Sequence, residues 1–190
     1  SLAGQELEYV MIPGLGEEAD FEGLDVAGLS TEEQTVVEEM RYVDDVTLEL
    51  SVEAELPESY VRQQAERLKL YRKIDAMTEE SALSKFESEM EDRFGKMPQQ
   101  AKELMNAVRL RWEAMRLGME RVKVKNGLMI VRFVGDDKSP YYRSDVFMEL
   151  LRKITAQPDR FVLKQRDGKL QMTVRQVADI ATAVEILKNL

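Results

Sequence analysis

Four carboxylates gathered in one short stretch are the first side chains in this sequence that could do chemistry. They are Glu87, Glu89, Glu91 and Asp92. Paired carboxylates can bind Mg²⁺ or act as general acid and base. On a helix, residues two apart diverge, whereas Glu89 and Asp92, three apart, share a face. We interpret the cluster first as a solvated acidic face, second as a protein-binding patch, and last as a metal or catalytic site.

Two other stretches combine aromatic and basic side chains, as some surfaces that bind nucleic acid do. They consist of Trp112 with Arg109, Arg111 and Arg116, and of Tyr141 and Tyr142 with Arg143. A single tryptophan on a helix is more commonly a partly buried packing residue with an arginine stem over it. We favour packing for both stretches and keep nucleic-acid binding as the alternative.

The composition excludes several classes of enzyme. The 190 residues include no histidine and no cysteine, so the chain has no Ser-His triad, disulfide, or imidazole or thiolate metal site. The nucleotide-binding pattern G-x-x-x-x-G-K-[ST] is also absent, because Gly95-Lys96 and Gly168-Lys169 are each followed by an apolar residue. We expect no catalytic residue, no metal and no cofactor in this chain.

Charge is distributed unevenly along the chain. Residues 1–60 hold 17 Asp and Glu against one basic residue, whereas residues 61–190 hold 19 acidic and 26 basic residues. We therefore expect residues 1–44 to be an acidic linker or lead-in and residues 45–190 to be the folded domain. The lead-in contains one short helix signal, a capping box at Ser30.

The ends and apolar runs of the sequence give two further expectations. The chain starts with Ser1-Leu2 rather than Met, so we expect it to be part of a longer protein. No apolar run is long enough to span a bilayer, and we expect no secretion leader. We expect a cytoplasmic location and no membrane partner.

Periodicity predicts the elements that position these side chains. Residues 46–56 alternate strictly between apolar and polar, which indicates a strand with one buried face. Three helices are predicted to follow, over residues 58–77, 78–95 and 98–118, with Thr78 capping the second and Pro98 opening the third. The first two are expected to bury Val61, Ala65, Leu68 and Ile74, and Leu83, Phe86 and Met90.

The remaining sequence predicts two hairpins and two helices. Asn126-Gly127 and Asp167-Gly168 each separate two strand-like segments, and such pairs supply the positive φ angles of two-residue turns. Ser144 is expected to cap a helix between the hairpins, and a last helix is expected from Val177 to about Leu187. Grouped hairpins predict an α+β fold, with helices packed on mainly antiparallel strands.

The first and second predicted helices carry a recognisable pattern. Arg67-Leu68-Lys69-Leu70-Tyr71-Arg72-Lys73-Ile74 is followed by Glu89-Met90-Glu91-Asp92-Arg93-Phe94-Gly95-Lys96-Met97-Pro98. Together with the later elements, residues 46–190 resemble the C-terminal domain of bacterial transcription-repair coupling factors (Mfd, the TRCF family). The D-R-F-G-x-x-P core is specific when it follows the Y-R-x-I helix.

The resemblance implies a regulatory function without catalysis. In this family the terminal domain packs against a UvrB-like region of the same protein and masks the surface that recruits UvrA. Release is expected when the factor engages stalled RNA polymerase, and ATP and Mg belong to the motor of the parent translocase. Glu89 and Asp92 fall where the family has acidic residues that meet arginines of the UvrB-like region. Direct contact with nucleic acid is not expected.

The other motif residues are assigned to structure. These are Arg67, Tyr71, Arg93, Phe94, Gly95 and Pro98. Arg93 is expected to be a cation favourable to the helix dipole, Phe94 a buried anchor, and Gly95 a cap. A nucleic-acid-binding accessory domain is the second hypothesis for the whole chain, and an enzyme with carboxylate chemistry is the third.

Overall fold

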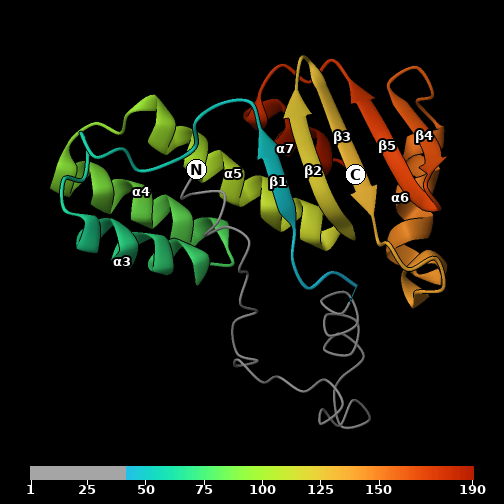
Figure 1. Cartoon of the computed structure of the whole chain (residues 1–190), viewed down its shortest axis with the longest axis horizontal. Helices are drawn as coiled ribbons and strands as arrows, with labels where there is room; N and C mark the ends of the chain where they lie inside the picture. Colours follow the sequence, from blue (N-terminus) through green and yellow to red (C-terminus); the bar gives the residue numbers. More distant parts are fainter. Residues whose placement is uncertain (1–41) are drawn as a thin grey trace, which may run out of the picture.

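The computed structural model describes residues 42–190, and it confirms the expected α+β class. Over those residues a five-stranded sheet is combined with five α-helices and one 3-10 helix (Figure 1). In chain order they are β1 (Thr47–Leu50), α3 (Gln64–Asp75), α4 (Glu80–Phe94), α5 (Gln99–Arg116), β2 (Met119–Lys125), β3 (Leu128–Phe133), η3 (Pro140–Arg143), α6 (Asp145–Thr155), β4 (Phe161–Arg166), β5 (Lys169–Arg175) and α7 (Ile180–Lys188). The predicted helix at Ser30 lies outside the described residues.

The sheet has the order β1-β2-β3-β5-β4 and is antiparallel except where β1 runs parallel to β2. Both predicted hairpins are confirmed. Asn126 and Asp167 have φ angles of 55° and 54°, and the following Gly127 and Gly168 both have 74°. These are the left-handed conformations that a two-residue primed turn requires.

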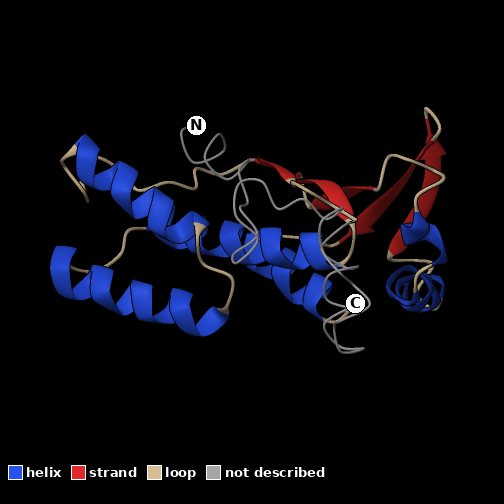
Figure 2. Ribbon diagram, turned by 90° about the horizontal axis from the view of Figure 1, so that it is seen from below, coloured by secondary structure: helices blue, strands red, loops and turns tan. Residues whose placement is uncertain are grey.

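Two apolar cores lie at the two ends of α5. One core lies between the sheet and the helices α5, α6 and α7, which cover the same face of the sheet (Figure 2). The other core is helical and joins α3, α4 and the first part of α5. The predicted buried face of α4 is confirmed, since Leu83, Phe86 and Met90 are all buried there. The helix α5 therefore connects a helical subregion to the sheet.

The first strand is shorter than predicted. It ends at Leu50, and Val52 is 49% exposed. Ala54 and Leu56 are buried, but they pack in the helical core rather than on the sheet. The backbone N–H of Leu56 donates to the hydroxyl of Tyr71 at 2.8 Å, which holds this extended segment against α3. The alternation of residues 46–56 thus spans a short strand and a separate extended segment.

The first predicted helix begins six residues later than expected, at Gln64. Pro57 instead starts a turn, whose carbonyl accepts from the N–H groups of Tyr60 and Val61. The guanidinium of Arg67 then donates to the carbonyl of Val61 at 2.7 Å. Because a side chain takes the hydrogen bond that a helix would form, the helix cannot extend back through this segment.

Several predicted helix details also need correction. Ala65 is exposed, and the buried side chains of α3 are Leu70, Tyr71 and Ile74. The N-cap of α4 is Glu79 rather than Thr78, and the last helix begins at Ile180 rather than near Val177. Pro98 occupies the N-cap of α5, and the Ser144 hydroxyl caps α6 as predicted. No helix in residues 42–190 is long and apolar enough to cross a membrane.

Candidate protein-binding site

The helix α4 separates the four clustered carboxylates onto two faces. Glu87 faces α5, where its Oε1 accepts from Nη2 of Arg109 at 2.7 Å. Glu91 turns to the helix end, where its Oε1 accepts from the backbone N–H of Met97 at 3.4 Å. Glu89 projects toward α3 instead. Carboxylates two residues apart therefore point in different directions on the helix, as expected.

Glu89 belongs to one of two ion pairs that join α3 to α4. Its Oε2 lies 3.1 Å from Nζ of Lys73, and about half of each side chain is exposed. Near the other end of the two helices, Nη1 of Arg93 lies 2.6 Å from Oε1 of Glu66. Exposed pairs of this kind contribute about 0–1 kcal/mol each, so they align the helices more than they stabilise them.

Asp92 is exposed one helical turn beyond Glu89. Within residues 42–190 its carboxylate takes part in no ion pair or side-chain hydrogen bond. It can therefore accept a cation from another protein without breaking an existing contact. Glu89 must first release Lys73, and the two acidic residues differ in this respect although they share a face.

A shallow hollow of about 350 Å³ adjoins Glu89 at the connection between α3 and α4. It is lined by Lys73, Ala76, Met77, Thr78, Glu79, Ala82, Lys85, Phe86 and Glu89. The ammonium group of Lys73 lies 5.7 Å from the ring centroid of Phe86, so the charged rim directly adjoins apolar surface. This combination can receive a partner side chain that has an apolar stem and a charged end.

The other motif residues support the helical subregion. Tyr71 is buried and its hydroxyl accepts from Leu56, as described above. Gly95 ends α4 with a φ of 88°, and its carbonyl accepts from the hydroxyl of Tyr60 at 2.8 Å. Phe94, expected as a buried anchor, is only partly buried, because its ring packs at the edge of the core 5.8 Å from the Tyr60 ring. The guanidinium carbon of Arg93 lies 4.8 Å from the centroid of the Phe94 ring.

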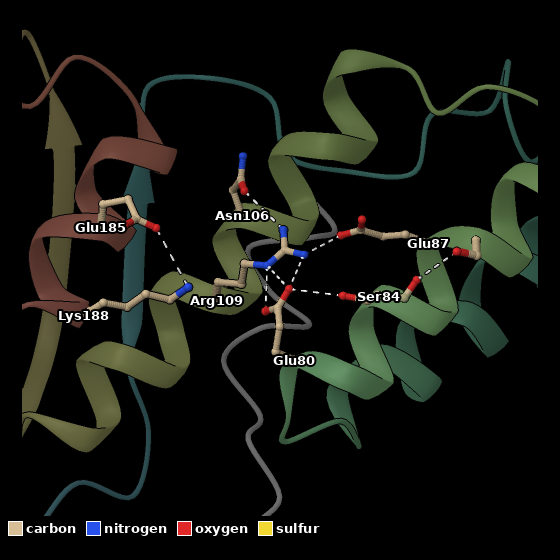
Figure 3. A network of polar contacts seen from close by, with 8 residues as sticks. Glu80, Ser84, Glu87, Asn106, Arg109, Glu185 and Lys188 are labelled. Carbon is tan, nitrogen blue, oxygen red and sulfur yellow. Dashed lines mark hydrogen bonds and ion pairs between the residues drawn. The ribbon is translucent and has the colours of Figure 1, made fainter.

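The arginines near Trp112 do not form a free basic surface. Arg109 donates to both carboxylate oxygens of Glu80 and to Glu87, which ties α4 to α5 (Figure 3). Arg111 is 2% exposed and pairs with Asp45, and Arg116 donates to Glu113 and to the carbonyl of Leu187. Trp112 itself is partly buried against the helical core.

The hydrogen bonds from Arg109 lower the pKa of the Glu80 carboxyl. The carboxylates of Glu80 and Glu87 in turn raise the pKa of Arg109. Both groups therefore remain charged at neutral pH. The guanidinium of Arg109 is mostly buried, and all three of its nitrogens donate to acceptors on neighbouring side chains. The arginine is a structural bond between helices, which removes it from the residues that could contact phosphate.

The two tyrosines of the second aromatic stretch also pack inward, whereas Arg143 is exposed. Tyr141 is fully buried and its hydroxyl donates to the carbonyl of Leu117 at 2.6 Å. Tyr142 is partly buried and donates to the carbonyl of Val134. Within residues 42–190 no group of three or more acidic side chains is arranged to hold a metal ion.

Sequence reasoning missed the basic partner of Glu89. Lys73 lies two residues before the end of α3 at Asp75, whereas Glu89 lies nine residues after the start of α4 at Glu80. The two helices are therefore offset along their length, and local spacing does not reveal which residues of one helix face those of the other.

Comparison with known proteins identifies relatives of the whole chain. The TRCF domain family model matches residues 50–144. The transcription-repair-coupling factor of Rickettsia conorii is 26% identical over 193 aligned residues, covering all of this chain and 16% of that protein. The same factor of Staphylococcus epidermidis is 28% identical over 94 residues, covering 50% of this chain and 8% of that protein. The chain thus spans a small part of the curated relatives that it matches.

A solved structure has the same fold. The crystal structure of the C-terminal domain of a transcription-repair coupling factor matches with a TM-score of 0.58 and 16% sequence identity. The match covers 76% of this chain and 92% of that domain. Since the family model also covers half of the sequence, including the α3–α4 pair and all of α5, the chain belongs to the TRCF domain family.

Proposed function

We propose that this chain is a non-catalytic regulatory domain of a transcription-repair coupling factor and acts by binding another protein surface. The observation that supports this most directly is the exposed face of α4, where Glu89 and Asp92 lie one turn apart beside the α3–α4 hollow. In the proposed function this face docks on a UvrB-like region of the same protein. Docking masks the surface that recruits UvrA.

The chemistry of the face suits a contact that opens and closes. Charged groups at an interface favour the correct partner and register more than they add affinity. Contacts between domains of one chain are commonly modest in area and polar, so their relative position can change. Asp92 offers a free carboxylate, and Glu89 offers one that exchanges Lys73 for a cation of the partner. The docked and released states can therefore lie close in free energy.

The remaining parts of the proposal rest on family membership. The parent protein is proposed to be a cytoplasmic DNA translocase that uses ATP and Mg. Its engagement with stalled RNA polymerase is proposed to release this domain and expose the UvrA-binding surface. The chain itself is proposed to need no cofactor for its part in this sequence of events.

A capture experiment with the full coupling factor tests the docking role. We expect Glu89→Lys combined with Asp92→Lys to raise the amount of UvrA captured by about tenfold, since reversed charges repel the arginines expected opposite them. A matched control reverses two exposed carboxylates away from this face, Glu53→Lys and Asp159→Lys. The control should leave capture unchanged.

Folding must be measured for the same substitutions. Far-UV circular dichroism and urea unfolding of the 190-residue chain should show the same secondary structure for the variant, the control and the wild type. If the α4 variant folds normally and UvrA capture stays at the wild-type level, the docking proposal is wrong. Equal increases for the α4 variant and the control would also contradict it, because the effect would then follow net charge alone.

A further inference from the structure

The sheet has one face without helices. In each strand alternate side chains point to the core that α5, α6 and α7 cover, and the others point to the opposite side. Figure 2 shows the helices on one side of the sheet only. The uncovered side is called the open face here, and its residues follow from the strand register.

The open face is strongly basic. Its lysines and arginines are Arg121, Lys123 and Lys125 on β2, Arg132 on β3, Lys164 and Arg166 on β4, and Lys169 and Arg175 on β5. On the strands, Glu49 of β1 is the carboxylate that pairs with them. Glu120, at the irregularity of β2, instead accepts from the backbone N–H of Gly135 at 2.9 Å.

Glu49 shows how a carboxylate binds to this face. One oxygen pairs with Arg121, and the other lies 3.8 Å from Nζ of Lys123. Six basic residues of the face have no ion pair with any residue of the described part of the chain. They are Lys125, Arg132, Lys164, Arg166, Lys169 and Arg175. Like charges held this close repel one another, so a negatively charged occupant would stabilise the sheet.

The residues between these cations indicate what kind of anion fits. The middle of the open face is formed by Leu128, Ile130, Val162 and Thr173. None of the open-face residues on the five strands is aromatic, so the face offers no platform on which nucleic-acid bases could stack. The face can therefore bind a partner through its charge and through small apolar contacts, and an acidic peptide with apolar side chains can make both kinds of contact.

We infer that the open face binds the acidic segment of this same chain, residues 1–41. That segment contains 11 Asp and Glu and a single basic residue, with apolar residues between the acidic ones. It joins the described domain at Tyr42, which lines a hollow of about 340 Å³ together with Arg121 and Arg132 of the open face. Three carboxylates, those of Asp44, Asp45 and Glu120, also line this hollow. The acidic segment therefore starts beside the basic residues that would receive it.

Covalent connection makes the intramolecular contact efficient. A binding segment joined by a short stretch of chain has an effective concentration in the millimolar range, so weak individual ion pairs suffice. While bound, the segment neutralises the face and excludes other polyanions, including the phosphate backbone of nucleic acid. The inference does not depend on the proposed docking role, since α4 and the open face are separate surfaces.

Zero-length cross-linking of the full 190-residue chain tests the contact. A carbodiimide joins lysines to carboxylates that form ion pairs, and peptide mass spectrometry identifies the joined residues. We expect Lys123, Lys125 and Lys164 to be linked to the peptides that contain Glu17–Glu39, and 1 M salt to abolish the links. Lys85 and Lys102, which are exposed on α4 and α5, are the matched controls.

The distribution of the links decides the outcome. Absence of links to the open face, or equal linking of the control lysines, would overturn the inference. A mixture of ¹⁵N-labelled and unlabelled chains separates contacts within one chain from contacts between copies. Links found only between differently labelled chains would also overturn it, because the occupant would then be a second copy.

Competition with DNA gives an independent readout. A fluorescent 20-base-pair duplex is titrated at low salt with a variant that carries Gln at Glu17, Glu18, Glu22, Glu32 and Glu33. The control neutralises five exposed carboxylates elsewhere, with Gln at Glu53, Glu58, Glu79 and Glu185 and Asn at Asp159. We expect the first variant alone to bind the duplex about tenfold more tightly than the wild type.

Two results of the titration would contradict the inference. If the wild type binds the duplex tightly and the first variant binds it no more tightly, the open face is a nucleic-acid surface that the acidic segment does not occupy. If the wild type and both variants bind the duplex equally weakly, the segment does not compete for the face. Adding Arg132→Ser and Lys164→Ser to the first variant should return its affinity to the wild-type level.

Discussion

Nζ of Lys73 on α3 lies 3.1 Å from Oε2 of Glu89 on α4, at the edge of the α3–α4 hollow. This ion pair makes the two acidic residues of the proposed docking face unequal. A cation of the partner can approach Asp92 directly, whereas it must displace Lys73 from Glu89. Binding at Glu89 therefore exchanges one ion pair for another, and the net gain is smaller.

The first prediction concerns this inequality. We expect Asp92→Asn to weaken docking on the UvrB-like region by about tenfold and Glu89→Gln by no more than about threefold, within the range of rim charges. Isothermal titration of the chain against the UvrB-like region measures both. Equal losses would show that Lys73 does not compete with the partner.

Lys73→Gln provides the control for that prediction. Removing the competing cation should tighten docking a few-fold and should make the effect of Glu89→Gln as large as that of Asp92→Asn. The free energy of unfolding should change by less than about 1 kcal/mol, because the pair is exposed. A double-mutant cycle of Lys73 and Glu89 measures the coupling directly.

The second prediction concerns Arg109, whose guanidinium holds Glu80 and Glu87 between α4 and α5. We expect Arg109→Met to lower the free energy of unfolding by about 1–3 kcal/mol at pH 7, because two carboxylates lose a charged donor. Urea unfolding measures this loss. Arg152→Met removes an exposed pair with Glu149 and should leave stability unchanged.

The pH dependence of the same variant has a definite sign. Arg109 holds the pKa of Glu80 below its usual value of 4.5 in the folded state. A lowered carboxyl pKa stabilises the fold above the unfolded-state pKa, and this contribution disappears as the pH falls through the folded-state pKa. The deficit of Arg109→Met should therefore shrink below about pH 4.5. A constant deficit from pH 7 to pH 3 would contradict this assignment.

Much of the fold follows from local signals in the sequence. The hairpin at Asn126-Gly127 and the buried stripe of α4 depend on turn conformation and helical spacing, which neighbouring residues determine. The position at which β1 ends does not follow from local signals. Ala54 and Leu56 continue the alternation of the strand, but tertiary contact with Tyr71 takes them into a different core. Nothing local in the sequence distinguishes the two cores.

The candidate site was predictable to a similar extent. Helical spacing alone places Glu89 and Asp92 on one face and Glu91 on another. It does not show that Lys73 neutralises Glu89, because that contact joins two helices. For the same reason Arg109 was a candidate for contact with phosphate until its carboxylate partners on α4 were known. The basic open face likewise depends on strand order, which brings together residues of four strands.

The third prediction concerns Gly118, where α5 turns into β2. Gly118 has a φ of 76°, and a Cβ added there would lie 2.2 Å from Cε1 of the buried Tyr141 ring. We expect Gly118→Ala to lower the free energy of unfolding by about 2–4 kcal/mol, from the strained backbone and the clash together. Chemical denaturation measures the loss.

Gly127→Ala separates the two causes. Gly127 has a similar φ of 74°, but a Cβ there meets nothing within 4 Å. The control should therefore lose only the backbone contribution, about 1 kcal/mol. If both variants lose the same amount, close packing of Tyr141 on Gly118 does not contribute to stability.

The last prediction concerns Tyr142, whose hydroxyl donates to the carbonyl of Val134. Burial, with the nearby Glu120, Asp137 and Asp136, raises its pKa from 10.0 to about 12. The folded state thus keeps the proton that the unfolded state loses above pH 10, and this stabilisation disappears as the pH rises through about 12. Between those values wild-type stability should fall more steeply than that of Tyr142→Phe, by at most about 1.4 kcal/mol per pH unit. Parallel curves in urea unfolding would exclude this role.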